Sequence, residues 1–189
     1  MPPAKHELVE VFSKEIESLS GKCYQASNLA EVIRIILGIV AQNNCLLVVK
    51  QRLGLEGEEQ IKTELEHHGV RVSELEECEK PIDTLSAADM AITPADLLIA
   101  KTGTVAISTK SDEERLASCL PRIHVAIISN GRIAPDPLDA ARYLNDRLES
   151  ESPGSVTFVS GPSRTADIEM KLILGVHGPH QVHVIILSS

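Results

Sequence analysis

The sequence predicts a single-domain α/β protein with three α/β/α layers, in which helices cover both faces of a mostly parallel sheet. Short, continuous apolar runs alternate along the chain with longer segments of helical periodicity, which is the pattern of strands buried on both faces. The 189 residues suit one domain that spans residues 1–189, and a hydrophobic content of 43% is enough for a substantial core. Because only 2% of the residues are aromatic, we expect this core to be aliphatic.

Two helices are expected before the first central strand. Apolar residues recur at helical spacing over residues 8–19, which predicts an amphipathic helix within residues 1–21 that packs on the rest of the domain. Asn28 and Glu31 have the spacing of a capping box, so a second and more apolar helix is expected over residues 29–40.

Four short apolar runs are expected to be strands of one sheet, because they are too short for independent helices and suit burial on both faces. They cover residues 45–49, 125–128, 156–159 and 182–187. A shorter strand is expected at residues 70–72, after Gly69. Further helices are expected over residues 58–68, 111–120 and 138–148. Thr93-Pro94 with Asp96 predicts a single capped helical turn.

Charge and composition limit the classes of partner that the protein can have. A formal charge of −9 without a long basic run argues against nucleic acid or an anionic membrane surface as the main partner. The first 19 residues are charged and amphipathic, and no apolar run approaches the length of a membrane span, so we expect a cytoplasmic protein.

The cysteines do not form a recognisable ligand set. Cys23, Cys45, Cys78 and Cys119 lie far apart, which predicts neither a CxxC zinc site nor a run of iron–sulfur ligands. We expect reduced thiols that mostly fill the core. No GxGxxG follows a predicted strand and no metal site is predicted, so the sequence identifies no cofactor.

Three glycine-bearing polar segments adjoin predicted strands and are the candidate ligand-binding loops. In open α/β sheets, loops at the carboxyl ends of strands gather into one crevice, so we expect the three segments to line a shared anion pocket. The first is Thr102-Gly103-Thr104, where two hydroxyls flank a glycine that lets backbone amides approach a ligand. The alternative is a tight turn or bulge within a sheet.

The second segment supplies hydroxyl and guanidinium donors where a strand is expected to give way to a helix. Its candidate ligand-binding residues are Gly161, Ser163, Arg164, Thr165 and Asp167. A helix N-terminus attracts anions, and an arginine beside it adds a bidentate grip. Helix capping explains the same residues equally well.

The third segment holds His177 between Gly175 and Gly178, in what we expect to be a constrained loop. An imidazole in this position could donate a hydrogen bond or transfer a proton, although a lone histidine is more often structural. His177 and Glu169 are the candidate catalytic residues, and Gly178 is a candidate ligand-binding residue.

The second half of the chain resembles a known family. Residues 160–169, 174–179 and 183–187 resemble the C-terminal signature of the LUD domain family, and residues 100–104 and 120–124 match it in the same order. Lys101 departs from the pattern, since the family commonly has an acidic residue there. The resemblance implies a fold similar to the NagB/ribose-phosphate isomerase/CoA-transferase class.

The resemblance also implies a function. Members of the branch that serves lactate utilization work with two iron–sulfur companion proteins in the oxidation of L-lactate to pyruvate. We therefore expect a non-iron–sulfur binding or assembly subunit with a pocket for a small anionic metabolite. The alternative is a stand-alone enzyme for a phosphorylated or CoA-linked small molecule, with His177 or Glu169 as acid or base and Arg164 as the anion-binding group.

Overall fold

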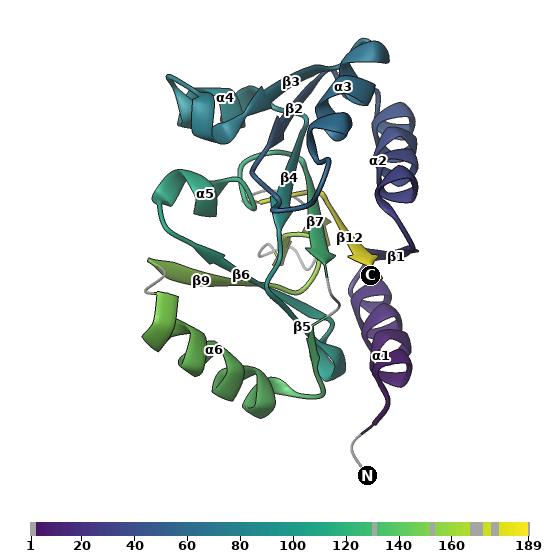
Figure 1. Cartoon of the computed structure of the whole chain (residues 1–189), viewed down its shortest axis with the longest axis vertical. Coiled ribbons are helices and arrows are strands. Elements are labelled where there is room, and N and C mark those ends of the chain that lie inside the picture. Colours follow the sequence, from purple (N-terminus) through teal and green to yellow (C-terminus); the bar gives the residue numbers. More distant parts are fainter. Residues whose placement is uncertain (1–2, 130–131, 152–153, 167–171, 175–177, 189) are drawn as a thin grey trace.

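The computed structural model describes residues 3–129, 132–151, 154–166, 172–174 and 178–188. Within these ranges, six strands form a central sheet in which every neighbouring pair is parallel (Figure 1). The strand order is β1 (Lys22–Ala26), β12 (Gln181–Leu187), β7 (Ile123–Ser129), β4 (Met90–Pro94), β2 (Leu47–Lys50) and β3 (Arg71–Glu74). The predicted α/β fold with a mostly parallel sheet is confirmed.

One face of the central sheet packs against α2 (Leu29–Asn43) and α3 (Glu59–His67). The predicted cap of α2 is confirmed, because the Asn28 side chain accepts a hydrogen bond from the Glu31 amide at 2.9 Å. The Glu31 carboxylate accepts from the Ser27 amide at 2.7 Å, one residue earlier than in a capping box.

The opposite face of the central sheet packs against α1 (Lys5–Ser18), α4 (Pro81–Ala87) and the segment that follows α5 (Asp112–Leu116). Alternate strand residues divide between the two faces, as the pleat requires: Val48 packs on the α2 side and Val49 on the α4 side. The sheet is therefore buried on both faces, and its strands read as continuous apolar runs.

A second sheet of four strands also lies on the α1 side of the central sheet. Its order is β8 (Ile133–Ala134), β5 (Leu97–Ile99), β6 (Thr104–Thr109) and β9 (Ser155–Val159). Leu98 and Val105 face the core shared with α1, whereas Leu97 and Ala106 face α6 (Pro137–Glu151).

The expectation that residues 156–159 belong to the central sheet is wrong. They form β9, which pairs antiparallel with β6 in the second sheet. An apolar run indicates burial but not which sheet provides it, and β9 is only partly buried, with Phe158 56% exposed. The other three runs, at 45–49, 125–128 and 182–187, contribute β2, β7 and β12 to the central sheet as predicted.

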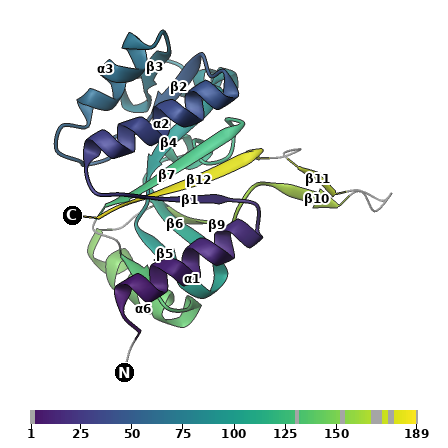
Figure 2. The same ribbon diagram turned by 90° about the vertical axis from the view of Figure 1, so that its right-hand side faces the viewer.

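Two expected helix starts are also wrong. The turn expected at Thr93-Pro94 is the end of β4, and the Asp96 carboxylate accepts the Ser108 amide rather than amides of a helix. The helix expected after Ser163 is instead a strand, β10 (Arg164–Ala166), which pairs antiparallel with β11 (Leu172–Leu174). This hairpin projects away from the body of the protein (Figure 2).

Candidate functional site

The Thr102-Gly103-Thr104 segment is a tight turn between β5 and β6. Ile99 pairs with Thr104 across the hairpin, and Gly103 has a left-handed φ of 55°. A Cβ atom added to Gly103 would lie 2.5 Å from the Ile16 amide nitrogen. The glycine therefore allows the backbone of α1 to approach the turn, and the hairpin geometry agrees with the structural reading of this motif.

Part of the second predicted segment lies beside this turn. The Thr104 hydroxyl is 2.7 Å from the Thr102 hydroxyl and 2.7 Å from the Ser160 hydroxyl. Gly161 has a φ of 103°, and a Cβ atom there would lie 2.7 Å from the Leu19 carbonyl oxygen. The structure thus brings Thr102–Thr104 and Ser160–Gly161 together against the end of α1.

A small pocket of about 270 Å³ adjoins these three hydroxyls. Its other described lining residues are Ile99, Pro137, Ala140, Ala141 and Phe158. No charged side chain appears among these lining residues, and the neighbouring Lys101 ammonium lies 3.5 Å from the Asp136 carboxylate. The pocket beside the Thr-Gly-Thr turn is largely apolar, which suits an anion poorly.

Two further predicted site residues, Ser163 and Gly178, lie near the amino end of β12. The Ser163 amide donates to the Pro179 carbonyl at 2.9 Å, and a Cβ atom on Gly178 would lie 3.0 Å from the Ser163 Cβ atom. Arg164 and Thr165 lie in β10, and the structure describes only their backbone. Asp167, Glu169 and His177 lie outside the described residues, so the shared crevice stays a prediction.

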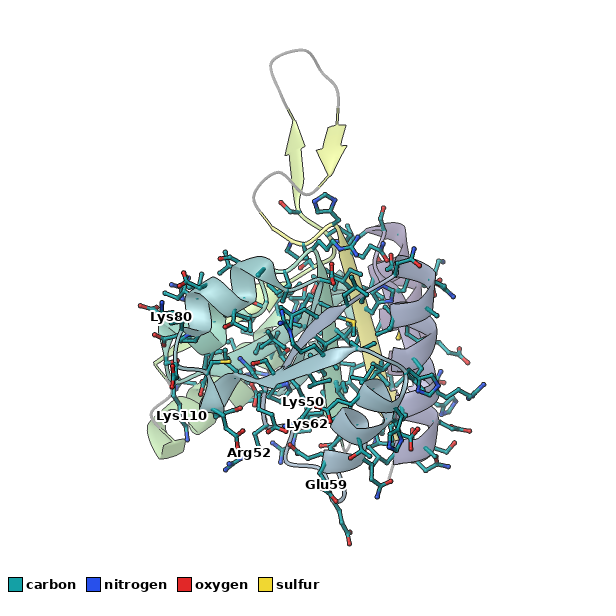
Figure 3. The ribbon with its side chains drawn as sticks, turned by 90° about the horizontal axis from the view of Figure 1, so that it is seen from above. Lys50, Arg52, Glu59, Lys62, Lys80 and Lys110 are labelled. Carbon is teal, nitrogen blue, oxygen red and sulfur yellow. The ribbon has the colours of Figure 1, made fainter. Side chains whose placement is uncertain are left out.

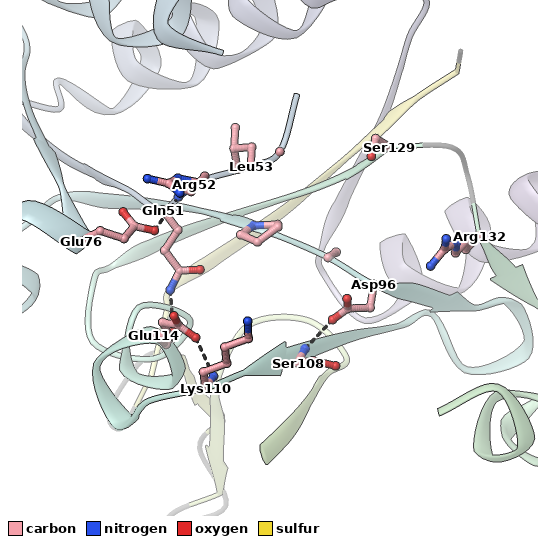
Figure 4. Close-up of a pocket in the computed structure, with 13 residues that line it drawn as sticks. Gln51, Arg52, Leu53, Glu76, Asp96, Ser108, Lys110, Glu114, Ser129 and Arg132 are labelled. Carbon is pink, nitrogen blue, oxygen red and sulfur yellow. Dashed lines mark hydrogen bonds between the residues drawn. The ribbon is translucent and has the colours of Figure 1, made fainter. Parts of the chain in front are cut away.

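A larger pocket lies at the carboxyl edge of the central sheet (Figure 4). From β2 the chain moves outward to β3 and then returns to β4 on the other side of β2. Loops that leave β2 and β4 therefore diverge, and such a switch point is where open α/β sheets hold ligands. The pocket measures about 580 Å³, and we call it the carboxyl-edge pocket. It is lined by Gln51, Arg52, Leu53, Gly54, Glu76, Pro94, Ala95, Asp96, Ser108, Lys110, Glu114, Ser129 and Arg132.

Each of the three carboxylates in this pocket accepts a backbone amide. Glu76 accepts from the amide of Arg52 at 2.8 Å, Glu114 from the amide of Lys110 at 2.6 Å, and Asp96 from the amide of Ser108. The acidic side chains therefore hold the loops of the pocket wall in place.

The three cations of the pocket have no carboxylate partner among the described residues. No hydrogen bond or ion pair joins the Arg52 guanidinium or the Lys110 ammonium to another described side chain. The Arg132 guanidinium donates to the Tyr143 hydroxyl and lies 5.6 Å from the centre of the Tyr143 ring. In the described part of the chain, no carboxylate therefore lies in direct contact with these three positive charges.

A buried ion pair fixes the loop between β2 and α3. Lys50 is 1% exposed, and its ammonium lies 3.1 Å from Glu58 and 3.8 Å from Glu74. The Glu58 carboxylate also accepts the amides of Leu53 and Leu55. Burial alone would raise the pKa of Glu58, but these amides and the Lys50 ammonium together lower it, so this carboxylate is charged at neutral pH.

The carboxyl-edge pocket is not among the sites predicted from the sequence. Gln51 and Arg52 directly follow a correctly predicted strand, so the rule that ligands gather at carboxyl ends could have identified them. Lys110 and Arg132 carried no such signal, because they come from the second sheet and from the segment after β7. Figure 3 shows Arg52 and Lys110 on the side of the molecule opposite the β10–β11 hairpin.

The described residues contain neither a candidate metal site nor a candidate membrane span. No group of three or more histidine, cysteine, aspartate or glutamate side chains in this part of the chain could hold a metal ion. None of the helices there combines the length and the apolar character needed to cross a membrane.

The fold and the carboxyl-edge pocket define an α/β protein with a ligand-sized cavity at the switch point of a parallel sheet. The model of the LUD domain matches residues 9–187, and the chain belongs to this family. A solved structure of a DUF162 family protein from Deinococcus radiodurans has the same fold, with a TM-score of 0.69 and 18% identity over 98% of this chain and 99% of that one.

Several relatives carry the name lactate utilization protein C. The protein of this name from Geobacillus sp. (strain WCH70) is 37% identical over 112 residues, which are 58% of this chain and 46% of the relative. The one from Oceanobacillus iheyensis is 40% identical over 103 residues, which are 53% of this chain and 44% of the relative. The matched region therefore spans about half the length of these relatives.

Proposed function

We propose that this chain acts in lactate utilization, as a component of a cytoplasmic system that oxidises L-lactate to pyruvate. The observation that carries the proposal is the LUD domain match over residues 9–187, together with relatives named lactate utilization protein C at up to 40% identity. In this proposal the chain is one component of the system, and the complex as a whole carries out the oxidation.

Within that system the chain serves as a binding or assembly subunit with an anion pocket, beside companion proteins that carry iron–sulfur centres. The wide spacing of Cys23, Cys45, Cys78 and Cys119 supports this division of roles, because cluster ligands usually occur in closely spaced runs. The Arg52, Lys110 and Arg132 side chains of the carboxyl-edge pocket, which form no ion pair with a carboxylate among the described residues, support the anion-binding part.

Growth of the native organism tests the proposal. Deletion of the gene should abolish or strongly slow growth on L-lactate as the sole carbon source, and the unaltered chain supplied in trans should restore it. Growth of the same strain on glucose is the control. An affinity-tagged copy should co-purify with iron–sulfur proteins from lactate-grown cells. Normal growth on lactate together with a tagged copy that purifies alone would contradict the proposal.

A further inference from the structure

We infer that the carboxyl-edge pocket binds an organic molecule with two separated anionic groups, carboxylate or phosphate, held by Lys110 and Arg132 on different walls. The inference deepens the proposed anion-binding role and rests on it, but it assigns the pocket to residues outside the glycine-bearing segments. It also names the ligand class, which the similarity to lactate utilization proteins does not.

The position of the pocket supports a ligand site. The loops after β2 and β4 diverge at the switch point, and the walls around it are fixed by the backbone. The Ala95 amide donates to the Ile127 carbonyl at 2.8 Å, and the Leu98 amide donates to the Arg132 carbonyl at 2.9 Å. Gln51 donates its side-chain amide to the Glu114 carbonyl at 2.8 Å, which ties the β2 end to α5. A cavity with anchored walls loses little entropy when it binds.

The arrangement of charges indicates two anionic groups. Lys110 extends from the end of β6 and Arg132 from the segment before β8, and Figure 4 draws Asp96 between them. Because the two cations come from different segments of the wall, a molecule with two charged ends could meet both. The Ser108 and Ser129 hydroxyls also line the pocket, so hydroxyl groups in the middle of the ligand would find hydrogen-bonding partners there.

The size and lining of the pocket narrow the class further. Its volume of about 580 Å³ lies within the range of roughly 300–1,000 Å³ that is usual for drug-sized ligands. Lactate, with three carbon atoms, would leave most of this space to water. The described lining residues include no aromatic side chain on which a nucleobase could stack. A hydroxylated, open-chain or sugar-like molecule with charged ends fits these features.

Calorimetric titration of the full chain tests the inference with two matched probes. D-Glucarate has a carboxylate at both ends of a hydroxylated six-carbon chain, and D-gluconate has one at a single end. Fructose 1,6-bisphosphate tests phosphate in place of carboxylate, and L-lactate tests the small acid. At least one of the two-ended probes should bind ten times or more tighter than D-gluconate and L-lactate, with an affinity that falls as salt is added.

Single substitutions of the pocket cations test where the two-ended probes bind. Lys110→Met and Arg132→Gln should each weaken the tighter two-ended probe by roughly 10- to 100-fold, the usual effect of losing one charge-assisted hydrogen bond. Both side chains are exposed, so the variants should unfold at nearly the unaltered temperature. Lys101→Met and Arg142→Gln are the controls, because these exposed cations already have the partners Asp136 and Asp139 and lie outside the pocket.

Two results would overturn the inference. One is an affinity for both two-ended probes no better than that for D-gluconate. The other is tight binding that survives Lys110→Met and Arg132→Gln but is lost in Lys101→Met, which would move the site to the Thr-Gly-Thr turn. Neither result bears on the lactate proposal, which the growth of the deletion strain tests separately.

Discussion

At Gly103 and Gly161 a side chain would collide with the last turns of α1, so these glycines are accounted for by packing alone. Both residues have left-handed φ values, and both lie against the backbone of residues 15–19. The sequence at Thr102-Gly103-Thr104 is compatible with a tight turn, but it does not indicate which segment packs against that turn. A glycine in sequence looks the same whether a ligand or a helix occupies the missing side chain's place.

Substitution of Gly103 tests this account. Gly103→Ala should lower the free energy of unfolding by about 1–3 kcal/mol, because the new Cβ atom meets the α1 backbone and the left-handed conformation is strained. Gly38→Ala is the matched control: Gly38 lies within α2 with nothing near its Cβ position, so alanine there should stabilise the protein by about 0.5–1 kcal/mol. Urea denaturation measures both. Equal stability of the two variants would show that α1 does not confine the turn.

The elements that the sequence predicted well are those with a strong local signal. The apolar runs at β2, β7 and β12 and the cap of α2 depend on neighbouring residues, so the pattern alone identifies them. The errors occur where pairing with a strand that is distant in sequence determines the secondary structure. Pro94 resembles a helix start in sequence but ends β4 beside β7, and residues 156–159 join β6 rather than the parallel sheet.

The loop that forms one wall of the carboxyl-edge pocket depends on the Lys50–Glu58 pair. Removal of one charge from a buried pair leaves the other without compensation, so Lys50→Met should destabilise the protein by about 3 kcal/mol. The double variant Lys50→Met with Glu58→Gln should recover part of that loss, since no buried charge then lacks its partner. Urea denaturation of both variants gives the comparison. A double variant less stable than the sum of the two single changes would contradict the ion-pair account.

At the scale of the whole molecule, the carboxyl-edge pocket is assembled from five or more segments that are distant in sequence. The general rule that carboxyl ends of parallel strands gather ligands led to the glycine-bearing segments and not to the residues that follow β2. Thr102–Thr104 belongs to the second sheet, and Gly178 precedes β12 at the amino edge. Glycine-bearing motifs are recognisable in the sequence itself. Gln51, Lys110 and Arg132 cannot be told from ordinary polar residues until the strand order of the sheet is known.

Two buried histidines connect the central sheet to the pH response of the fold. His124 on β7 and His183 on β12 are both fully buried. The His124 ring lies 2.9 Å from the Thr93 hydroxyl, and the His183 ring lies 3.2 Å from the Tyr24 hydroxyl. Burial lowers the pKa of each histidine to about 4, with a further contribution from His183 at His124 and from Lys22 at His183. Both imidazoles are therefore neutral in the folded protein at pH 7.

These two pKa values predict an early loss of stability on acidification. The histidines of the unfolded chain take up protons below their ordinary pKa of 6.5, whereas the folded protein does so only near pH 4. Their contribution to the free energy of unfolding is therefore fully present above pH 6.5 and is lost as the pH falls toward 4. For the pair, the free energy of unfolding falls by up to about 2.7 kcal/mol per pH unit. Carboxylates with lowered pKa values, such as Glu58 and Asp89, lose their contribution only below about pH 4.5.

Urea denaturation between pH 7.5 and 4.5 measures the response within the window that the histidines control. The free energy of unfolding should fall steadily below pH 6.5, and His183→Gln should remove about half of the slope. His68→Gln is the matched control, because it removes an exposed imidazole at the end of α3. If the unaltered protein kept the same free energy of unfolding from pH 7 to pH 5, the two buried imidazoles could not be held neutral by the fold.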